Sequence, residues 1–577
     1  MISSTGVTGV VNILIDTLNL KGIVQQAAAN NGNSKSSNNN NDKVMMDMRP
    51  VIFVGPHEHH SNLLPWRESG AEVITISEEP TTGMVNIAEL ERYLNLPKYN
   101  SSSGRLRIGA FSSVSNVTGL IANVDKLAIV LHKYGALAFF DYASGAPYLK
   151  MDMNPNPIQF SNEGGNGNVV DPSKDAIYFS PHKCYGGPST PGVLIIKKHL
   201  ISQINPPSVS GGGTVFYVSN TSHRFLSNRI ERYEGGTPDG LGVQRVGLSL
   251  LAGRRVGREY ERIVQSVVDK ESSGGDNEKC PPKTLLEYEC STYDRVVKEL
   301  KEHAPNLIML GTIVNNDDSS SSSSSSCVGR HLPIFSFLIR CGKRFLHYNY
   351  VCAILNDVFG IQSRGGCQCA GPYSQRLLGM TTINESNEEV PNNANKQIEC
   401  ALLRSDRPCE LLRPGYSRLS LPFKGLREEE VDYVISALIW VAKNGWMLLP
   451  QYTCDHRTGE WRHWSRRGKP LGKSERRWLS HYDILSPTTF EKSFAIQPSV
   501  NDMSDSTQAS KDRLARATDN ANAILEAAKN NLRFLSEAEK MNTASGMLGG
   551  VDDTLEDLRW YVYQQEVSQS LREGLIE

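Results

Sequence analysis

Short apolar runs alternate with longer amphipathic or polar stretches through the first part of the chain. The runs fall at residues 51–55, 72–76, 106–111, 137–141, 176–180 and 193–196. Apolar runs of this length, bounded by turn residues, are typical of buried strands, and helical stretches between them indicate a parallel sheet covered by helices. A helix is predicted over 10–20. The pattern therefore predicts an α/β fold with a largely parallel sheet.

The pattern changes after the last of these runs. From 254 to 442 helical stretches mix with short strands, including 331–339 and 417–421, which predicts a smaller α+β domain. Beyond 446 the chain is rich in Trp, Arg and His, which favours a packing strap over a surface that stacks nucleic-acid bases. The stretch 512–575 is mostly helical in period and either mediates association or docks in cis. We expect domains at 1–250 and 251–445, followed by an extension at 446–577.

Polar low-complexity tracts interrupt both predicted domains. Residues 29–42 are rich in Asn and Ser, and 317–326 are nearly all Ser. Such tracts bury too little apolar surface to offset the entropy lost on ordering, so both are predicted to be disordered inserts. By the same reasoning, 271–283 and 384–396 are predicted to be surface loops.

Composition and charge narrow the class of protein. The chain has 577 residues, 39% of them hydrophobic, and a formal net charge of -1, which argues against a nucleic-acid or membrane-surface partner. Apolar stretches such as 434–441 are too short to span a bilayer. Eleven cysteines without regular spacing fit reduced intracellular thiols better than a disulfide framework. We therefore expect a cytoplasmic protein.

Two residues at or just after predicted strand ends are the main candidates for a catalytic site. Asp141 ends the run 137–141, and Lys183 follows His182 in a Gly/Pro-rich turn after 176–180. Taken singly, Lys183 reads as a solvated loop lysine and Asp141 as a helix cap or turn residue. A carboxylate at the end of a parallel strand lies where such sheets bind ligands, and a lysine can form an imine. Together they are what pyridoxal phosphate requires of a protein.

The motifs around these residues resemble one family. In order, they are Gly6-Val-Thr8-Gly-Val-Val-Asn12, Glu58-His59-His60-Ser-Asn62, Val114-Ser-Asn116-Val-Thr-Gly119, Asp141-Tyr-Ala-Ser144, Ser180-Pro-His182-Lys183, Glu234-Gly-Gly-Thr237-Pro, Arg364-Gly-Gly-Cys-Gln-Cys369 and Arg418-Leu-Ser. The chain resembles class V aminotransferases of fold type I, the group that contains cysteine desulfurases and selenocysteine lyases. The resemblance covers roughly the first three quarters of the chain, within the usual uncertainty of such boundaries.

The resemblance implies a fold and a cofactor site. It implies a fold type I pyridoxal-phosphate-dependent transferase, with a mostly parallel seven-stranded sheet flanked by helices and a smaller α+β domain. Lys183 would hold the cofactor as a Schiff base, Asp141 would face the ring nitrogen, and His59 would stack on the ring. The remaining cofactor contacts would come from Thr8, Asn116, Ser144, Ser180, His182 and Thr237.

Some of these positions depart from the family or imply a partner. Val7 stands where many relatives have a second hydroxyl, and Ser144 stands where glutamine is usual, with a shorter reach to the ring oxygen. Thr237 resembles a threonine that reaches the phosphate of the neighbouring subunit, which implies a homodimer.

The resemblance also implies an amino-acid substrate. Arg418 matches the arginine that holds the substrate carboxylate, a task that suits a planar bidentate group, and Arg364 would assist. Cys369 aligns with the nucleophilic cysteine of the desulfurases, in a Gly-rich loop that would let it swing toward the substrate. Cys367 falls where relatives have histidine, and disulfide formation or sulfur relay with Cys369 stays open.

The preferred interpretation is removal of sulfur from L-cysteine, which gives L-alanine and a persulfide on Cys369 for a sulfur-acceptor protein. The alternatives are selenocysteine lysis or amino-acid epimerisation on the same scaffold, or a catalytically weakened scaffold protein. No metal site is predicted, because His57, His59 and His60 have no second ligand cluster at a recognised spacing. The chain starts almost at the Gly6 turn, so we expect that a front segment is missing or has been lost. An organellar location therefore stays open.

Overall fold

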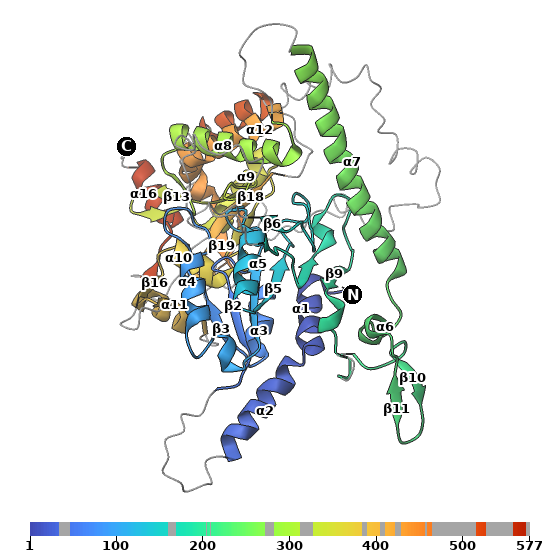
Figure 1. Ribbon diagram of the computed structural model, residues 1–577. Coiled ribbons are helices and arrows are strands. Elements are labelled where there is room, and N and C mark those ends of the chain that lie inside the picture. The colour runs from blue at the N-terminus through green and yellow to red at the C-terminus, as the bar shows by residue number, and fades with distance from the viewer. Residues whose placement is uncertain are drawn as a thin grey trace, which may run out of the picture. The chain divides into compact units, whose positions relative to one another are not determined.

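A computed structural model gives the fold. It describes the chain except for residues 34–46, 160–168, 203–204, 208, 272–281, 312–326, 384–388, 404–409, 422–427, 456–457, 464–514, 527–557 and 573–577. The described chain divides into two compact units (Figure 1). The first comprises Met1–Asp294, Gly311–Ile334 and Cys369–Ser374, and the second comprises Arg295–Leu310, Phe335–Gln368 and Gln375–Glu577. The predicted boundaries at 250 and 445 stay a prediction.

A seven-stranded sheet forms the centre of the first unit, in the order β1-β9-β8-β5-β4-β2-β3. Its strands are β1 (Ile2–Ser3), β2 (Val51–Val54), β3 (Glu72–Thr75), β4 (Arg107–Ser112), β5 (Leu137–Asp141), β8 (Ala176–Phe179) and β9 (Gly192–Ile196). The five strands from β8 to β3 are parallel, whereas β9 runs antiparallel to both β8 and β1. The predicted α/β fold with a mostly parallel seven-stranded sheet is confirmed.

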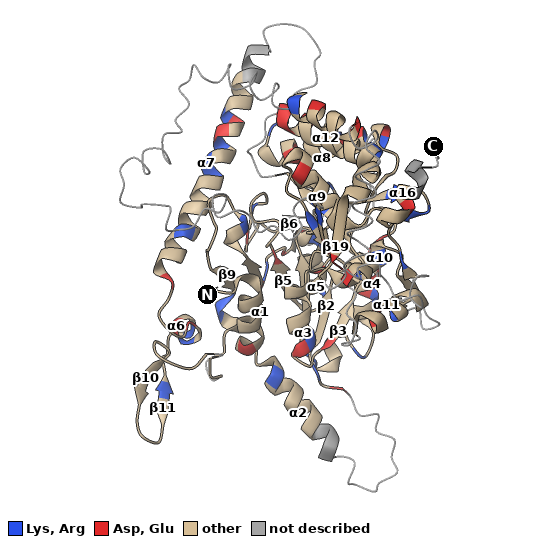
Figure 2. Ribbon diagram, turned by 180° about the vertical axis from the view of Figure 1, so that it is seen from behind, with Lys and Arg blue, Asp and Glu red and all other residues tan. Residues whose placement is uncertain are grey.

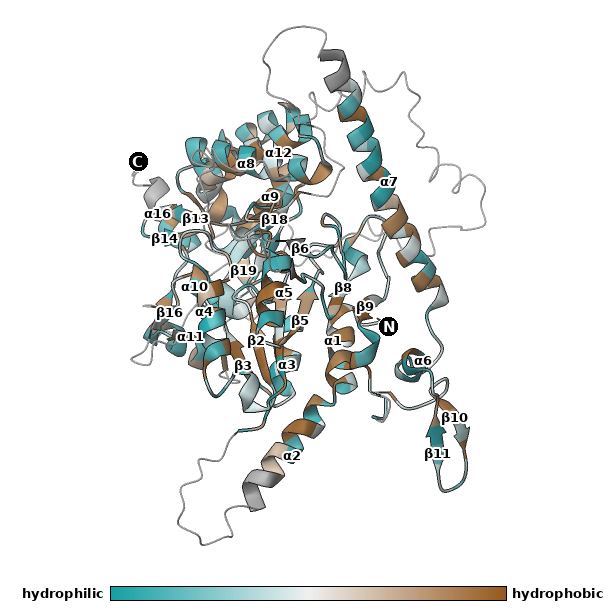
Figure 3. Cartoon of the chain, in the orientation of Figure 1, coloured by the Kyte–Doolittle hydropathy of each residue, from teal (hydrophilic) through white to brown (hydrophobic). Residues whose placement is uncertain are grey.

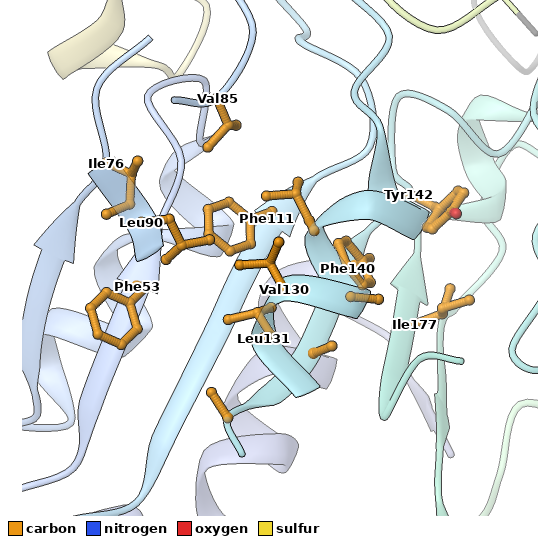
Figure 4. Close-up of a cluster of buried hydrophobic side chains, with 14 of the residues drawn as sticks. Phe53, Ile76, Val85, Leu90, Phe111, Val130, Leu131, Phe140, Tyr142 and Ile177 are labelled. Atoms are coloured by element: carbon orange, nitrogen blue, oxygen red, sulfur yellow. The ribbon is translucent and has the colours of Figure 1, made fainter. Parts of the chain in front are cut away.

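Helices cover both faces of this sheet, which is why its strands are apolar at successive positions. On one face α4 (Ile87–Asn95) and α5 (Val124–Lys133) bury Leu90 and Leu131 against Phe53, Phe111 and Phe140, as Figure 4 shows. Each of these side chains has a relative exposure of 0%. Because side chains alternate along a strand, the intervening residues point to the other face.

On the opposite face, α1 (Gly6–Thr17) and α3 (Leu64–Glu68) pack against the sheet. Val10 and Leu14 of α1 and Trp66 of α3 are buried against Ile52, Phe139 and other strand residues. The predicted helix at 10–20 is confirmed as α1, with earlier bounds. The α1 helix packs beside β8 and β9, so its N-terminus lies against the segments that flank those strands.

The rest of the first unit is built from peripheral elements. They are α2 (Leu20–Asn33), β6 (Ile158–Gln159), β7 (Val169–Val170), β10 (Val215–Val218), β11 (His223–Phe225), α6 (Arg229–Tyr233), α7 (Gly240–Glu271) and the first part of α8 (Leu285–His303). The tract 29–42 is predicted to be disordered, which is wrong for 29–33, because these residues end α2; the rest of the tract lies outside the described residues. The poly-Ser tract 317–326 lies outside them altogether.

The second unit contains a smaller sheet and helices, as predicted for the smaller domain. Its sheet has the order β12-β13-β18-β15, and β14 pairs with β13. Its elements are β12 (Leu307–Met309), β13 (Ile334–Cys341), β14 (Arg344–Phe345), α9 (Tyr348–Phe359), β15 (Arg364–Gly366), the last part of α10 (Gly371–Leu377), β16 (Thr381–Ile383), β17 (Glu389–Pro391), α11 (Asn393–Leu403), β18 (Tyr416–Ser420), α12 (Glu428–Asn444), β19 (Tyr452–Asp455), β20 (Glu460–His463) and α16 (Gln564–Arg572). The range 384–396, expected to be a loop, contains β17 and the start of α11.

The aromatic segment beyond 446 packs within the second unit. Trp461 of β20 is buried and donates a hydrogen bond from Nε1 to His347 Nδ1 at 3.2 Å. Near the C-terminus, Phe345 N donates to Trp560 O at 3.1 Å, and Gln564 Nε2 donates to Tyr452 O at 3.2 Å. The described part of the extension therefore docks in cis.

No described helix is by itself long and apolar enough to cross a membrane, although α1 and the first part of α2, bent by 48°, pass that test as a pair.

Figure 2 shows basic and acidic residues interspersed along α7 and α8. The prediction that the protein binds no nucleic acid stays a prediction.

Candidate functional site

The candidate site lies at the carboxyl edge of the large sheet. Because β2, β4, β5 and β8 are parallel, their C-terminal ends meet at one edge, where open α/β sheets bind ligands. Asp141 is the last residue of β5, Ser112 is the last residue of β4, and Ser180 directly follows β8. The tertiary structure thus brings together residues that are far apart in the sequence.

Lys183 and Asp141 interact at this edge. Lys183 ends a short 3-10 helix, η4 (Pro181–Lys183), and is exposed, whereas Asp141 is buried with 4% relative exposure. Burial raises the pKa of Asp141 to about 6, against the opposing effects of the Ala143 N–H, which donates to Oδ1 at 2.7 Å, and of the Lys183 charge. A bound cation beside Asp141 would lower that pKa and favour the carboxylate.

The N-terminus of α1 forms a cradle beside Lys183. Val7 N donates to Ser180 Oγ at 3.1 Å. Gly6 has φ +64, and a Cβ there would lie 3.1 Å from Ser180 Oγ and 3.4 Å from His182 Cε1. A glycine therefore leaves space where the helix N-terminus, Ser180 and His182 converge. Helix N-termini favour anions, so these residues fit the phosphate group of the expected cofactor.

His59 and Thr8 are connected through Ser61. Thr8 Oγ1 lies 2.7 Å from Ser61 Oγ, which lies 3.1 Å from His59 Nδ1. His59 also caps the short helix η2 (His60–Asn62), because its Nδ1 accepts from Ser61 N at 3.1 Å. Ser61 was not among the predicted site residues, although it stands inside the quoted His59-His60-Ser-Asn62 motif.

Glu58 is the second residue that the sequence reasoning missed. It is buried, with 4% relative exposure, and its carboxylate accepts hydrogen bonds from Gly55, Asn62 and Ser112. Burial raises its pKa to about 7, and the nearby Asp141 charge adds to this effect. The signal in the sequence was its place just after the apolar run 51–55, which puts it at the same edge as Asp141.

The backbone of Cys369 is held beside the short helix η2 that follows His59. His60 N donates to Cys369 O at 2.7 Å, and Gly371 N donates to His60 Nε2 at 2.9 Å. The backbone of Gln368 and Cys369 lies in the left-handed region, with φ 56 and φ 59. Cys369 is half-buried. The sequence predicts that the loop of Cys369 swings toward the substrate. In the structure, the backbone of this loop is hydrogen-bonded to His60.

The other predicted cofactor residues stand in turns and loops of the first unit. Asn116 is buried in a turn that Ser115 stabilises, because Ser115 Oγ accepts from Val117 N and Thr118 N. Ser144 is half-buried on the loop after Asp141. Thr237 is exposed, between α6 and α7. The cofactor contacts expected of these three residues stay predictions.

The predicted substrate residues belong to the second unit. Arg364 of β15 and Arg418 of β18 are register partners in its antiparallel sheet, and Cys367 follows β15. Their pairing within one sheet is shown, and their role at a substrate carboxylate stays a prediction.

A family model supports this reading of the first unit. Residues 38–253 match the model "Aminotransferase class-V". This part of the chain is similar to the aminotransferase class-V family. The matched part contains His59, Asn116, Asp141, Lys183 and Thr237, and the family consists of pyridoxal-phosphate-dependent enzymes. Thr8, Cys369, Arg364 and Arg418 lie outside the match.

Curated relatives are distant cysteine desulfurases. A probable cysteine desulfurase of Chlamydia muridarum is 30% identical over 205 residues, which is 34% of this chain and 44% of that protein. One of Pyrococcus abyssi is 27% identical over 235 residues, 40% of this chain and 52% of that protein. The chain thus spans about half the length of the curated relatives it matches.

Solved structures of cysteine desulfurases are also similar. One from Thermococcus onnurineus is 22% identical, covers 68% of this chain and 73% of that chain, and has a TM-score of 0.46. One from Escherichia coli is 19% identical, covers 67% and 71%, and has a TM-score of 0.43.

Proposed function

We propose that this chain is a pyridoxal-phosphate-dependent enzyme that acts on an amino acid, with cysteine desulfurase activity as the preferred reaction. The observation that carries the proposal is that the buried Asp141 at the end of β5 and Lys183, just after the neighbouring strand β8, meet at the carboxyl edge of the sheet. The family match and the cradle at Gly6 support it.

Each residue has a task in this proposal. When bound, the cofactor would supply an electron sink for bonds broken at the substrate α-carbon and β-carbon. Lys183 would attach it covalently and move the α-proton. Asp141 would remain a carboxylate and keep the ring nitrogen protonated, and the α1 N-terminus with Ser180 would bind the phosphate. Arg418, assisted by Arg364, would hold the substrate carboxylate.

The Cys369 thiolate would then attack the substrate sulfur. L-Cysteine and the Cys369 thiol would become L-alanine and a Cys369 persulfide, so that sulfur is transferred with no external oxidant or reductant. A sulfur-acceptor protein would take the outer sulfur. Selenocysteine lysis or epimerisation would use the same cofactor residues without needing this persulfide.

We also propose that the enzyme is a homodimer. Large apolar side chains are exposed on the β10–β11 hairpin and on α7, among them Phe216 and Leu241 at 74% each and Leu248 at 66%. Figure 3 shows apolar bands along α7. Exposed apolar surface on this scale marks an interaction site, and a second copy would bring Thr237 to its partner's phosphate, as the resemblance implies.

The first experiment locates the cofactor. The purified protein is incubated with pyridoxal 5'-phosphate and reduced with borohydride, and the modified peptide is identified by mass spectrometry. We expect the adduct on Lys183, with Lys197→Arg as a control variant that still forms it. An adduct on another lysine would show that Lys183 has been misassigned.

A further inference from the structure

Glu58 holds together three segments that meet at the carboxyl edge of the sheet. Its Oε1 accepts from Gly55 N at 3.2 Å and from Ser112 N at 2.9 Å. Its Oε2 interacts with Asn62 Nδ2 at 2.6 Å and with Ser112 Oγ at 2.7 Å. The contacts come from the end of β2, the end of β4 and the short helix η2.

Asn62 cannot turn its amide away from Glu58 without losing other contacts. Its Oδ1 accepts from Trp66 Nε1 at 3.2 Å and from the Tyr178 hydroxyl. Both of those groups can only donate to a carbonyl oxygen, so the Asn62 NH₂ group is directed to Glu58. Glu58 therefore completes a buried network that joins α3 and β8 to the ends of β2 and β4.

This network fixes the turn that carries His59 and Ser61. His59 directly follows Glu58, Ser61 directly precedes Asn62, and Ser61 also contacts Thr8 at the N-terminus of α1. Holding Glu58 and Asn62 thus holds both ends of the turn. We propose that Glu58 is a positioning residue, which clamps this turn to the sheet edge so that His59 and Ser61 face a cofactor held by Lys183 and Asp141. The inference rests on the proposed function.

Glu58 lies beside other titratable groups, yet its hydrogen bonds suit both of its protonation states. The titratable groups that face it are Asp141 of β5 and Tyr178 of β8, and Lys183 in turn faces Asp141. Gly55 N, Ser112 N and the Asn62 amide can only donate, whereas the Ser112 hydroxyl can donate to a carboxylate or accept from a protonated Oε2. The clamp can therefore persist in both protonation states of Glu58.

The first test uses the apoprotein and Glu58→Gln. The folded pKa of Glu58, about 7, lies above its ordinary 4.5, so the folded state binds more protons between these values. The contribution of Glu58 to the free energy of unfolding then falls as pH rises from about 4.5 to about 7 and levels off above that. Asp141 contributes the same sign only up to about pH 6. His132, whose pKa is raised by its hydrogen bond with Asp175, titrates in both proteins, so the measured quantity is the difference between them. Relative to the unmodified protein, Glu58→Gln should lack the Glu58 part of the fall between pH 6 and 7 in chemical denaturation.

The second test measures binding of pyridoxal 5'-phosphate by its absorbance. In Glu58→Gln the new NH₂ group would face the Asn62 NH₂ group, so this contact is lost and the turn is released. We expect about tenfold weaker binding, the size of one lost hydrogen bond to a charged group, with the adduct still on Lys183. The matched control is Glu89→Gln, since Glu89 also accepts from a serine N–H and hydroxyl, those of Ser77, but on a different segment. Its binding should equal that of the unmodified protein.

Ser112→Ala serves as a second variant should Glu58→Gln fail to fold. It removes a hydrogen bond that lowers the Glu58 pKa, so the window in which stability falls should move to higher pH. Unchanged titration and unchanged cofactor affinity in the variant that folds would overturn the role of Glu58. Absence of any adduct in the unmodified protein would instead overturn the proposed function, while the apoprotein titration would still test the clamp.

Discussion

At the scale of single residues, the proposed desulfurase reaction depends on Cys369. Its carbonyl oxygen is hydrogen-bonded to His60 N, so its backbone is placed one residue from His59. Cys367, two positions earlier, belongs with the second unit and lies beyond the buried Gln368. The two thiols are close in sequence, and the backbone of Cys369 is hydrogen-bonded to the segment that carries His59.

We predict that Cys369→Ser abolishes sulfide release from L-cysteine and that Cys367→Ser retains it, because only Cys369 would be the nucleophile. Sulfide and alanine are assayed with cysteine as substrate. The absorbance of bound cofactor should be unchanged in both variants, since neither thiol holds the ring. Full turnover by Cys369→Ser would favour a lyase or an epimerase that needs no cysteine.

At the scale of elements, the start of α1 depends on one glycine. Gly6 opens the helix with φ +64, in a space bounded by Ser180 and His182. The N–H groups that begin α1 are directed toward the same edge as Asp141 because α1 packs along β8 and β9. Local backbone conformation and sheet topology together build the cradle.

We predict that Gly6→Ala lowers the free energy of unfolding by about 1–2 kcal/mol, the usual strain of a side chain in the left-handed region. It should also weaken binding of pyridoxal 5'-phosphate. Gly253→Ala is the matched control, because Gly253 lies in α7 with open space around its Cβ position, and alanine there should be neutral or stabilising by up to about 1 kcal/mol. Equal effects of the two substitutions would argue against the cradle.

At the scale of the whole molecule, the exposed apolar side chains of the β10–β11 hairpin and α7 form the proposed dimer interface. They lie in the same part of the chain as the exposed Thr237. A closed two-fold dimer would cover the same surface on both copies, and it is the commonest assembly of soluble proteins.

We predict that light scattering finds a dimer and that the double variant Leu241→Glu, Leu248→Glu is monomeric, because burying two new carboxylates in an apolar interface is unfavourable. Lys298→Glu, at an exposed position of α8, is the control and should remain dimeric. A monomer that binds cofactor tightly would contradict both the interface and the role of Thr237.

The sequence by itself determined six strands of the large sheet and the α/β fold, and it singled out Asp141 and Lys183 as candidate site residues. Apolar runs with turn residues at their ends fix where strands lie, because a sheet covered on both faces needs apolar residues at successive positions. Asp141 and Lys183 stood out because each follows such a run. These signals are local, so they can be recognised from neighbouring residues in a single sequence, without knowledge of distant contacts.

Only the tertiary structure decided which distant residues meet. The roles of Glu58 and Ser61 depend on Ser112 and Thr8, which are remote in the sequence and become neighbours when parallel strands align their carboxyl ends. The hydrogen bond between His60 N and Cys369 O likewise joins two residues that are remote in the sequence. Such contacts are selected by the packing of the whole sheet and its helices, so no local pattern of residues records them.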